Sequence, residues 1–129
     1  IGMAILLITH DLGVVAQAAQ RVVIMYAGRV VEEASTMELF NTPLHPYTRG
    51  LLGSIPRPNQ EADEQGRPPP LPEVPGLVPS LAALPPGCRF APRCHLATPS
   101  CDMQDPAPIS HASGRRLACL NVGQSGSAP

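Results

Sequence analysis

The sequence predicts an α/β fold followed by a loop-rich segment that carries cysteines. An unbroken apolar run over residues 3–8 has the length and composition of a strand buried on both faces of a parallel sheet. Apolar residues at helical spacing follow in 12–20, and two runs rich in β-branched residues come next. The second half differs, because all of the 17 prolines except Pro43 and Pro46 lie from Pro56 onward. The α/β part is therefore expected in the first half only.

The apolar run ends at Thr9, His10 and Asp11. Ligands of open parallel sheets bind beyond the carboxyl ends of the strands, so His10 stands where chemistry would be placed. Asp11 occupies the N-cap position of the next helix, whose free N–H groups and positive dipole end would favour an anion near His10. Taken alone, a histidine at a strand end is more often a structural hydrogen-bonding group than a catalyst.

The next elements are a hairpin and a short helix. The β-branched runs Arg21 to Tyr26 and Arg29 to Glu33 are separated by Ala27-Gly28, which is the spacing of a tight hairpin. Ser35-Thr36-Met37-Glu38 has the form of a capping box, in which the serine and glutamate side chains each satisfy an N–H group at the helix start. A short helix is expected to follow and to end before Pro43.

Residues 45–52 read His-Pro-Tyr-Thr-Arg-Gly-Leu-Leu and predict another helix start. Pro46 suits the first helical position, because its ring fixes φ and its missing N–H would be unpaired there anyway. His45 then occupies the N-cap. The leucines are expected to dock on the preceding domain, and Pro56 is expected to end the helix.

Four parts of the chain follow from these patterns. Residues 1–55 are predicted to form the folded α/β part, and 56–79, rich in Pro, Glu, Gln, Gly and Arg, an extended connector without a core of its own. Residues 80–120 hold all four cysteines, and 121–129 form a small-residue tail predicted to be disordered.

Charge and composition exclude several functions. The net charge of -1 and the pI near 6.4 give no electrostatic case for nucleic acid as a partner. All nine basic residues are arginine, so the chain contains neither the lysine-bearing phosphate loop of nucleotide-binding proteins nor a lysine for Schiff-base chemistry. No apolar run has the length of a membrane span, and no secretory leader is recognisable, so a cytosolic protein is expected.

The string Leu-Leu-Ile-Thr-His-Asp at residues 6–11, with the helix and the Val-rich hairpin after it, resembles the end of the nucleotide-binding domain of ATP-binding-cassette (ABC) transporters, which are P-loop NTPases. The resemblance implies that His10 is the switch histidine, which contacts the γ-phosphate of Mg-ATP and orients the attacking water. A directional donor suits phosphoryl transfer, because this reaction is catalysed mainly by positioning and by groups aimed at developing charge. Residues 45–52 are similar to the HPYT-x-x-LL motif that follows the ATPase domain in oligopeptide, dipeptide and nickel importers.

The cysteines are spaced C-x5-C-x6-C-x17-C, at Cys88, Cys94, Cys101 and Cys119. None forms the close CxxC pair usual in zinc sites, whereas a four-iron cluster can be reached from separate loops. The pattern also looks like the C-terminal domain of peptide importers, which in several members binds a 4Fe-4S cluster. Zinc and reduced structural thiols remain alternatives, and disulfides are least favoured because no secretory context is visible.

Other polar residues accompany the cysteines. His95 and His111 are possible ligands, but a full set of four cysteines leaves them outside the predicted ligand set. Four arginines flank the cysteines and either offset the negative charge of four thiolates or form a solvated surface. They are Arg89, Arg93, Arg115 and Arg116.

The resemblance covers nearly all of residues 3–120 and implies the C-terminal part of the ATP-binding subunit of a peptide-type importer. Because the phosphate loop, the signature segment and the acidic Walker B strand are absent from the sequence, the chain is expected to be a fragment that does not hydrolyse ATP alone. The implied partners are a second ATP-binding subunit and transmembrane permease subunits, with the protein peripheral on the inner face of the cell membrane. A stand-alone iron-sulfur or other metal-binding module and a non-functional gene remnant are the rival hypotheses, and the transported substrate is left open.

Overall fold

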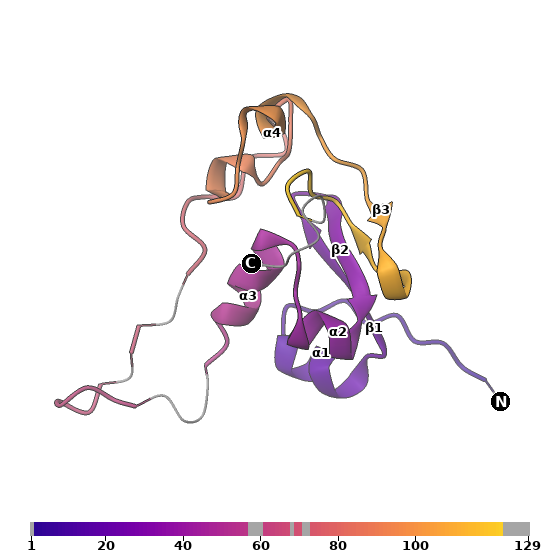
Figure 1. Cartoon of the computed structure of the whole chain (residues 1–129). Coiled ribbons are helices and arrows are strands. Elements are labelled where there is room, and N and C mark those ends of the chain that lie inside the picture. Colours follow the sequence, from indigo (N-terminus) through magenta and orange to yellow (C-terminus); the bar gives the residue numbers. More distant parts are fainter. Residues whose placement is uncertain (1, 57–60, 68, 71–72, 123–129) are drawn as a thin grey trace.

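The computed structural model describes residues 2–56, 61–67, 69–70 and 73–122. The helices are α1 (Leu12–Ala18), α2 (Thr36–Asn41), α3 (Pro46–Gly53) and α4 (Pro99–Met103), with 3-10 turns η1 (Ala91–Arg93) and η2 (Ala112–Gly114). The strands are β1 (Arg21–Tyr26), β2 (Arg29–Ser35), β3 (Ile109–Ser110) and β4 (Arg116–Leu117). They form one sheet in the order β1-β2-β4-β3, and every neighbouring pair is antiparallel. Helices α1 and α2 lie at one end of the molecule and α4 at the other (Figure 1).

The hairpin predicted around Ala27-Gly28 is confirmed. Ala27 and Gly28 have φ values of 46° and 79°, the two left-handed positions that a tight I′ turn requires. Strand β1 alternates strictly between exposed and buried residues, and Val22, Ile24 and Tyr26 form its buried face. This face supplies much of the core.

Strand β2 contains a bulge that changes which side chains are buried. Ile24 pairs with Glu32 and Met25 pairs with Val30, so Val31 has no partner across the hairpin. Successive residues of a regular strand point to opposite faces, but a bulge interrupts this alternation. Val31 and Glu32 are consequently both buried, and Glu32 has no exposed surface at all.

The buried Glu32 carboxylate bonds to groups that lie outside β2, in the α2–α3 loop and in the C-terminal segment. The backbone N–H groups of Leu44 and His45 donate to its two oxygens, at 3.0 and 2.9 Å. The Arg115 guanidinium donates to Glu32 Oε1 at 2.7 Å and to the Thr42 carbonyl at 2.7 Å. Because a buried charge is tolerated only when it is paired and hydrogen-bonded, this network fixes the α2–α3 loop and the C-terminal segment against β2.

The predicted helix starts are confirmed by their caps. Asp11 accepts from the N–H groups of Gly13 and Val14 at the start of α1. Ser35 and Glu38 form the capping box of α2, with the serine hydroxyl 2.8 Å from the glutamate carboxylate. His45 is fully buried at the N-cap of α3, where its Nδ1 accepts from the Tyr47 N–H at 3.1 Å.

The cysteine segment packs on the hairpin through a strand and an aromatic side chain. Strand β4 pairs with β2, and the Ala118 N–H donates to the Val31 carbonyl at 2.9 Å. Phe90 lies edge-on to Tyr26, with ring centroids 5.1 Å apart, and is 5.5 Å from the Tyr47 ring. Three of the four aromatic residues of the chain, one each from β1, α3 and the cysteine segment, therefore pack together. The predicted division at residues 55 and 79 stays a prediction.

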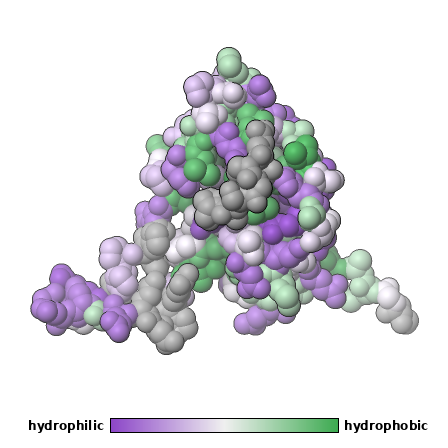
Figure 2. All heavy atoms as spheres, viewed as in Figure 1, coloured by the Kyte–Doolittle hydropathy of each residue, from purple (hydrophilic) through white to green (hydrophobic). Residues whose placement is uncertain are grey.

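The strand predicted for residues 3–8 is not formed, and that prediction is wrong for this structure. No strand pairs with this run, and its large apolar side chains are 49–89% exposed. A strand requires partners for its backbone groups, and among the described residues each strand pairs within the antiparallel sheet. The run instead extends from the body of the molecule beside α1, and Figure 2 shows apolar surface on this projection.

Two further predictions concern residues that lie partly outside the described part of the chain. Most of the tail predicted at 121–129 and parts of the connector at 56–79 lie outside them. Within residues 2–56, 61–67, 69–70 and 73–122, no helix has the length and apolar character needed to cross a membrane.

Replacing Glu32 by alanine tests the buried network. Glu32→Ala leaves Arg115 and the N–H groups of Leu44 and His45 without their acceptor, so we expect a loss of about 3–5 kcal/mol in the free energy of unfolding. Urea denaturation followed by circular dichroism measures the loss. Glu33→Ala is the matched control, since Glu33 is a neighbouring carboxylate paired with the half-exposed Arg21, and should cost about 1 kcal/mol or less. Equal losses for the two variants would contradict the role given to Glu32.

His45 makes the stability depend on pH. Burial lowers the pKa of His45 from 6.5 to about 4, although the Glu32 carboxylate and the Ala118 backbone oppose the change. Below pH 6.5 the unfolded chain therefore takes up a proton that the folded chain refuses. We expect the free energy of unfolding to fall by about 3 kcal/mol between pH 6.5 and 4. His45→Asn, which keeps an N-cap acceptor, should lose this part of the pH dependence in denaturation curves. An unchanged dependence would show that other groups cause it.

Candidate functional site

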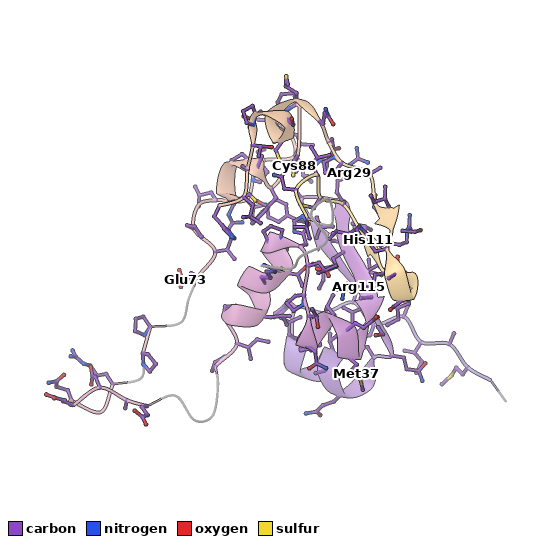
Figure 3. The ribbon with its side chains drawn as sticks, viewed as in Figure 1. Arg29, Met37, Glu73, Cys88, His111 and Arg115 are labelled. Atoms are coloured by element: carbon purple, nitrogen blue, oxygen red, sulfur yellow. The ribbon has the colours of Figure 1, made fainter. Side chains whose placement is uncertain are left out.

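The four cysteines come from three segments and line one pocket. Cys88 precedes and Cys94 ends the η1 turn, Cys101 lies in α4, and Cys119 follows β4. The other lining residues are mostly apolar or aromatic. All seven are His45, Pro46, Phe90, Ala91, Pro106, Leu120 and Asn121. In Figure 3, Cys88 lies near one end of the sheet, on the side of the molecule where α4 is found. The predicted set is thus gathered at one place, while its role as a ligand set stays a prediction.

A close backbone contact joins the first and third cysteines. The Cys88 N–H donates to the Cys101 carbonyl at 2.7 Å. A Cβ atom at Gly87 would overlap the same carbonyl oxygen, which backbone atoms cannot accommodate. Glycine is therefore required at residue 87 for the Cys88 loop to lie against α4.

Backbone N–H groups and burial act in opposite directions on the thiols. Burial raises the pKa values of Cys88 and Cys94 above the ordinary 9.0. Hydrogen bonds from the backbone of Phe90 and Ala91 lower the pKa of Cys88, and one from Leu96 lowers that of Cys94. The other cysteines raise both pKa values, because like charges repel at short range. A positive charge close to these sulfurs would oppose that repulsion and lower both pKa values.

Cys101 is the buried member of the set, with 6% of its surface exposed. Its sulfur accepts from the Thr98 N–H at 3.5 Å and from the Asn121 side-chain amide at 3.3 Å. The first contact closes a capping turn in which sulfur takes the place that a glutamate carboxylate usually fills. These two contacts hold the Cys101 side chain in its orientation.

The four cysteines offer only sulfur donors. All four thiols are free, and they reach the pocket from separate segments. In the described part of the chain, no three His, Cys, Asp or Glu side chains are arranged as ligands of one metal ion. A zinc ion needs all four sulfurs about 2.3 Å from a single point, whereas an iron-sulfur cubane spans more widely spaced thiolates. An apolar lining suits such a cluster because it limits solvent access.

The four arginines beside the cysteines have other partners. Arg89 donates to the Ala27 carbonyl, and Arg93 donates to the Tyr26 hydroxyl and to the carbonyls of residues 74 and 75. Arg115 pairs with Glu32, and Arg116 lies 3.6 Å from Glu33. These contacts hold the cysteine segment to the hairpin and connector. The hypothesis that the arginines serve to offset thiolate charge has no support in this geometry.

The structure does not bring His10 together with the cysteines. His10 is exposed in the segment before α1, and it is absent from the residues that line the cysteine pocket. The exposed Ile8 precedes it, and Asp11 after it caps α1. The geometry of His10 toward a nucleotide is therefore untested, and its predicted role stays a prediction.

Sequence reasoning missed two residues that contact the sulfur of Cys101, namely the pocket residue Asn121 and Thr98. Asn121 falls in the predicted tail, although its side chain donates to Cys101 Sγ and to the Leu96 carbonyl. Thr98 carries a sequence signal, because Thr-x-x-Cys has the spacing of a capping box. Nothing in the local sequence marks Asn121, because its partners lie 20 and 25 residues away.

Comparison with known proteins agrees with the resemblance. The chain is 52% identical over 117 residues to the "Oligopeptide transport ATP-binding protein AppD" of Bacillus subtilis, which covers 91% of this chain and 34% of that protein. It is 50% identical over 120 residues to a "Putative peptide import ATP-binding protein" of Brucella ovis, covering 93% and 33%. The "Oligopeptide transport ATP-binding protein OppD" of Mycobacterium tuberculosis is 49% identical over 121 residues, covering 94% and 19%.

The chain thus spans about one third or less of these curated relatives. The matched region includes the α3 motif and three of the four cysteines, because residues 31–101 match the family described as "Oligopeptide/dipeptide transporter, C-terminal region". The protein therefore belongs to the family of oligopeptide and dipeptide transporter C-terminal regions.

Proposed function

We propose that this chain is the C-terminal part of the ATP-binding subunit of a peptide-type ABC importer. The identity of about 50% to peptide-transport ATP-binding proteins over more than 90% of the chain carries the proposal. The fold agrees with it, since the HPYT segment forms a capped helix that Glu32 and the aromatic cluster hold against the hairpin. In the whole subunit, ATP hydrolysis would drive closure of two nucleotide-binding domains and pass force to the permease.

His10 would be the chain's contribution to the nucleotide site. An imidazole there can donate to the γ-phosphate of Mg-ATP and hold the attacking water in line, without acting as a nucleophile. Because the chain contains no lysine, it does not itself supply the phosphate loop. The exposed apolar residues before His10 support this arrangement, because so large an apolar surface is usually covered by other protein.

The expected partners follow from the same proposal. They are a second ATP-binding subunit and transmembrane permease subunits, and the protein would be cytoplasmic and peripheral on the inner face of the membrane. Peptides are the substrate class suggested by the relatives' names. Residues 1–55 would complete the ATPase domain, while 80–120 would form the cysteine-containing C-terminal domain.

We further propose that Cys88, Cys94, Cys101 and Cys119 hold a 4Fe-4S cluster, with zinc as the alternative. Four free thiols around one mostly apolar pocket, with N–H donors toward three of the sulfurs, support the cluster. A bound cluster would cross-link segments that share little core, and it would supply one-electron chemistry if it is redox-active.

ATP turnover tests the role of His10. In the whole subunit, His10→Ala removes the γ-phosphate donor, so we expect kcat for ATP hydrolysis to fall about 100-fold or more while ATP binding changes little. His95→Ala, at an exposed histidine of the cysteine segment, is the control. The 129-residue chain alone should show no turnover, and steady hydrolysis by it that is lost on His10→Ala would refute this assignment.

Metal analysis tests the cysteine site. Protein purified without oxygen should absorb broadly in the visible range and contain about four iron atoms and four sulfides per chain. Cys101→Ala should remove most of the iron, whereas Ser100→Ala, at the exposed neighbour, should keep it. Stoichiometric zinc in colourless protein would exclude the cluster.

A further inference from the structure

Asn121 connects three parts of the cysteine pocket through one side chain. Its Nδ2 donates to the Leu96 carbonyl at 2.6 Å and to Cys101 Sγ at 3.3 Å. Its Oδ1 lies 3.4 Å from the Thr98 hydroxyl. Asn121 comes two residues after Cys119, so this amide joins the segment of the fourth cysteine to the third cysteine and to the loop after the second.

The contact with sulfur is distinctive. Backbone N–H groups serve Cys88, Cys94 and Cys101, and within the described residues Asn121 provides the only side-chain amide that donates to a cysteine sulfur. The recipient, Cys101, is the buried one of the four. Water cannot readily replace a hydrogen bond to a buried sulfur. Removal of the Asn121 amide should therefore leave Cys101 Sγ without a substitute for this donor.

Hydrogen bonds to ligand sulfurs change the electronic balance of a cluster. The reduced cluster carries one more negative charge than the oxidised one, and an N–H donor stabilises the more negative form. Such a donor therefore raises the reduction potential. In the step concerned, the oxidised cluster gains one electron from a reductant in solution, and no covalent bond forms or breaks.

We propose that Asn121 is a positioning residue that holds Cys101 Sγ and raises the reduction potential of the iron-sulfur cluster. This inference rests on the proposed cluster, since it concerns how the chain's own residues act on that group. A merely structural Asn121 would tie the Leu96 loop in place but would leave the potential of the bound cluster unchanged.

A redox titration with dithionite, followed by electron paramagnetic resonance, separates the two roles. In Asn121→Ala we expect near-normal iron content. We also expect the equilibrium constant for reduction of the cluster to fall about tenfold, which lowers the midpoint potential by about 59 mV for one electron. Gln104→Ala, which removes an exposed amide after α4, is the matched control and should leave the potential unchanged.

Asn121→Asp is the second variant, to be used if the Asn121→Ala chain does not retain the cluster. Its carboxylate has the same shape, cannot donate to sulfur and adds negative charge, so it should lower the potential at least as far. Potentials equal to that of the unmodified chain, or loss of iron from both variants, would overturn the inference while the cluster itself stands. Colourless, iron-free unmodified chain would instead refute the proposed cluster, and this inference with it.

Discussion

The buried carboxylate of Glu32 organises the described part of this chain. Glu32 sits in a bulged strand, where the interrupted alternation places it on the core side. Removing its charge from water is costly, so its oxygens must be satisfied, and the groups that satisfy them come from the α2–α3 loop and from Arg115. The position of the HPYT helix and the return of the C-terminal strand both depend on this requirement. Through His45 and β4, the same network reaches the edge of the cysteine pocket.

Local patterns predicted the elements that local chemistry determines. The Ala27-Gly28 turn, the Ser35–Glu38 capping box and Pro46 at a helix start act within a few residues, and the structure has each of them. Burial of the run at 3–8 was predicted wrongly, because a strand depends on partners that its own sequence does not specify. The two-residue strands β3 and β4 are too short to carry a period, and the Glu32–Arg115 pair joins residues that no spacing rule connects.

The sequence allowed the four cysteines to be predicted as one group, but not the residues that contact them. Four cysteines in a loop-rich segment indicate a shared site on chemical grounds alone. Asn121 acts across a long sequence distance, and the flanking arginines depend on which carbonyls and carboxylates the fold brings to them. Arg93, for example, lies over the Tyr26 ring at 5.7 Å, so its closest associations are with the hairpin and the connector.

The Glu32–Arg115 pair joins residues 83 positions apart, with the proline-rich connector between them. The entropy of closing such a loop grows only with the logarithm of its length, and doubling the loop costs about 0.6 kcal/mol. The C-terminal strand therefore behaves as an internal ligand for the hairpin, present at an effective concentration that the connector sets. Insertions or deletions in the connector would change that concentration only slightly, so the spacing between the two halves is free to vary while their contacts are kept.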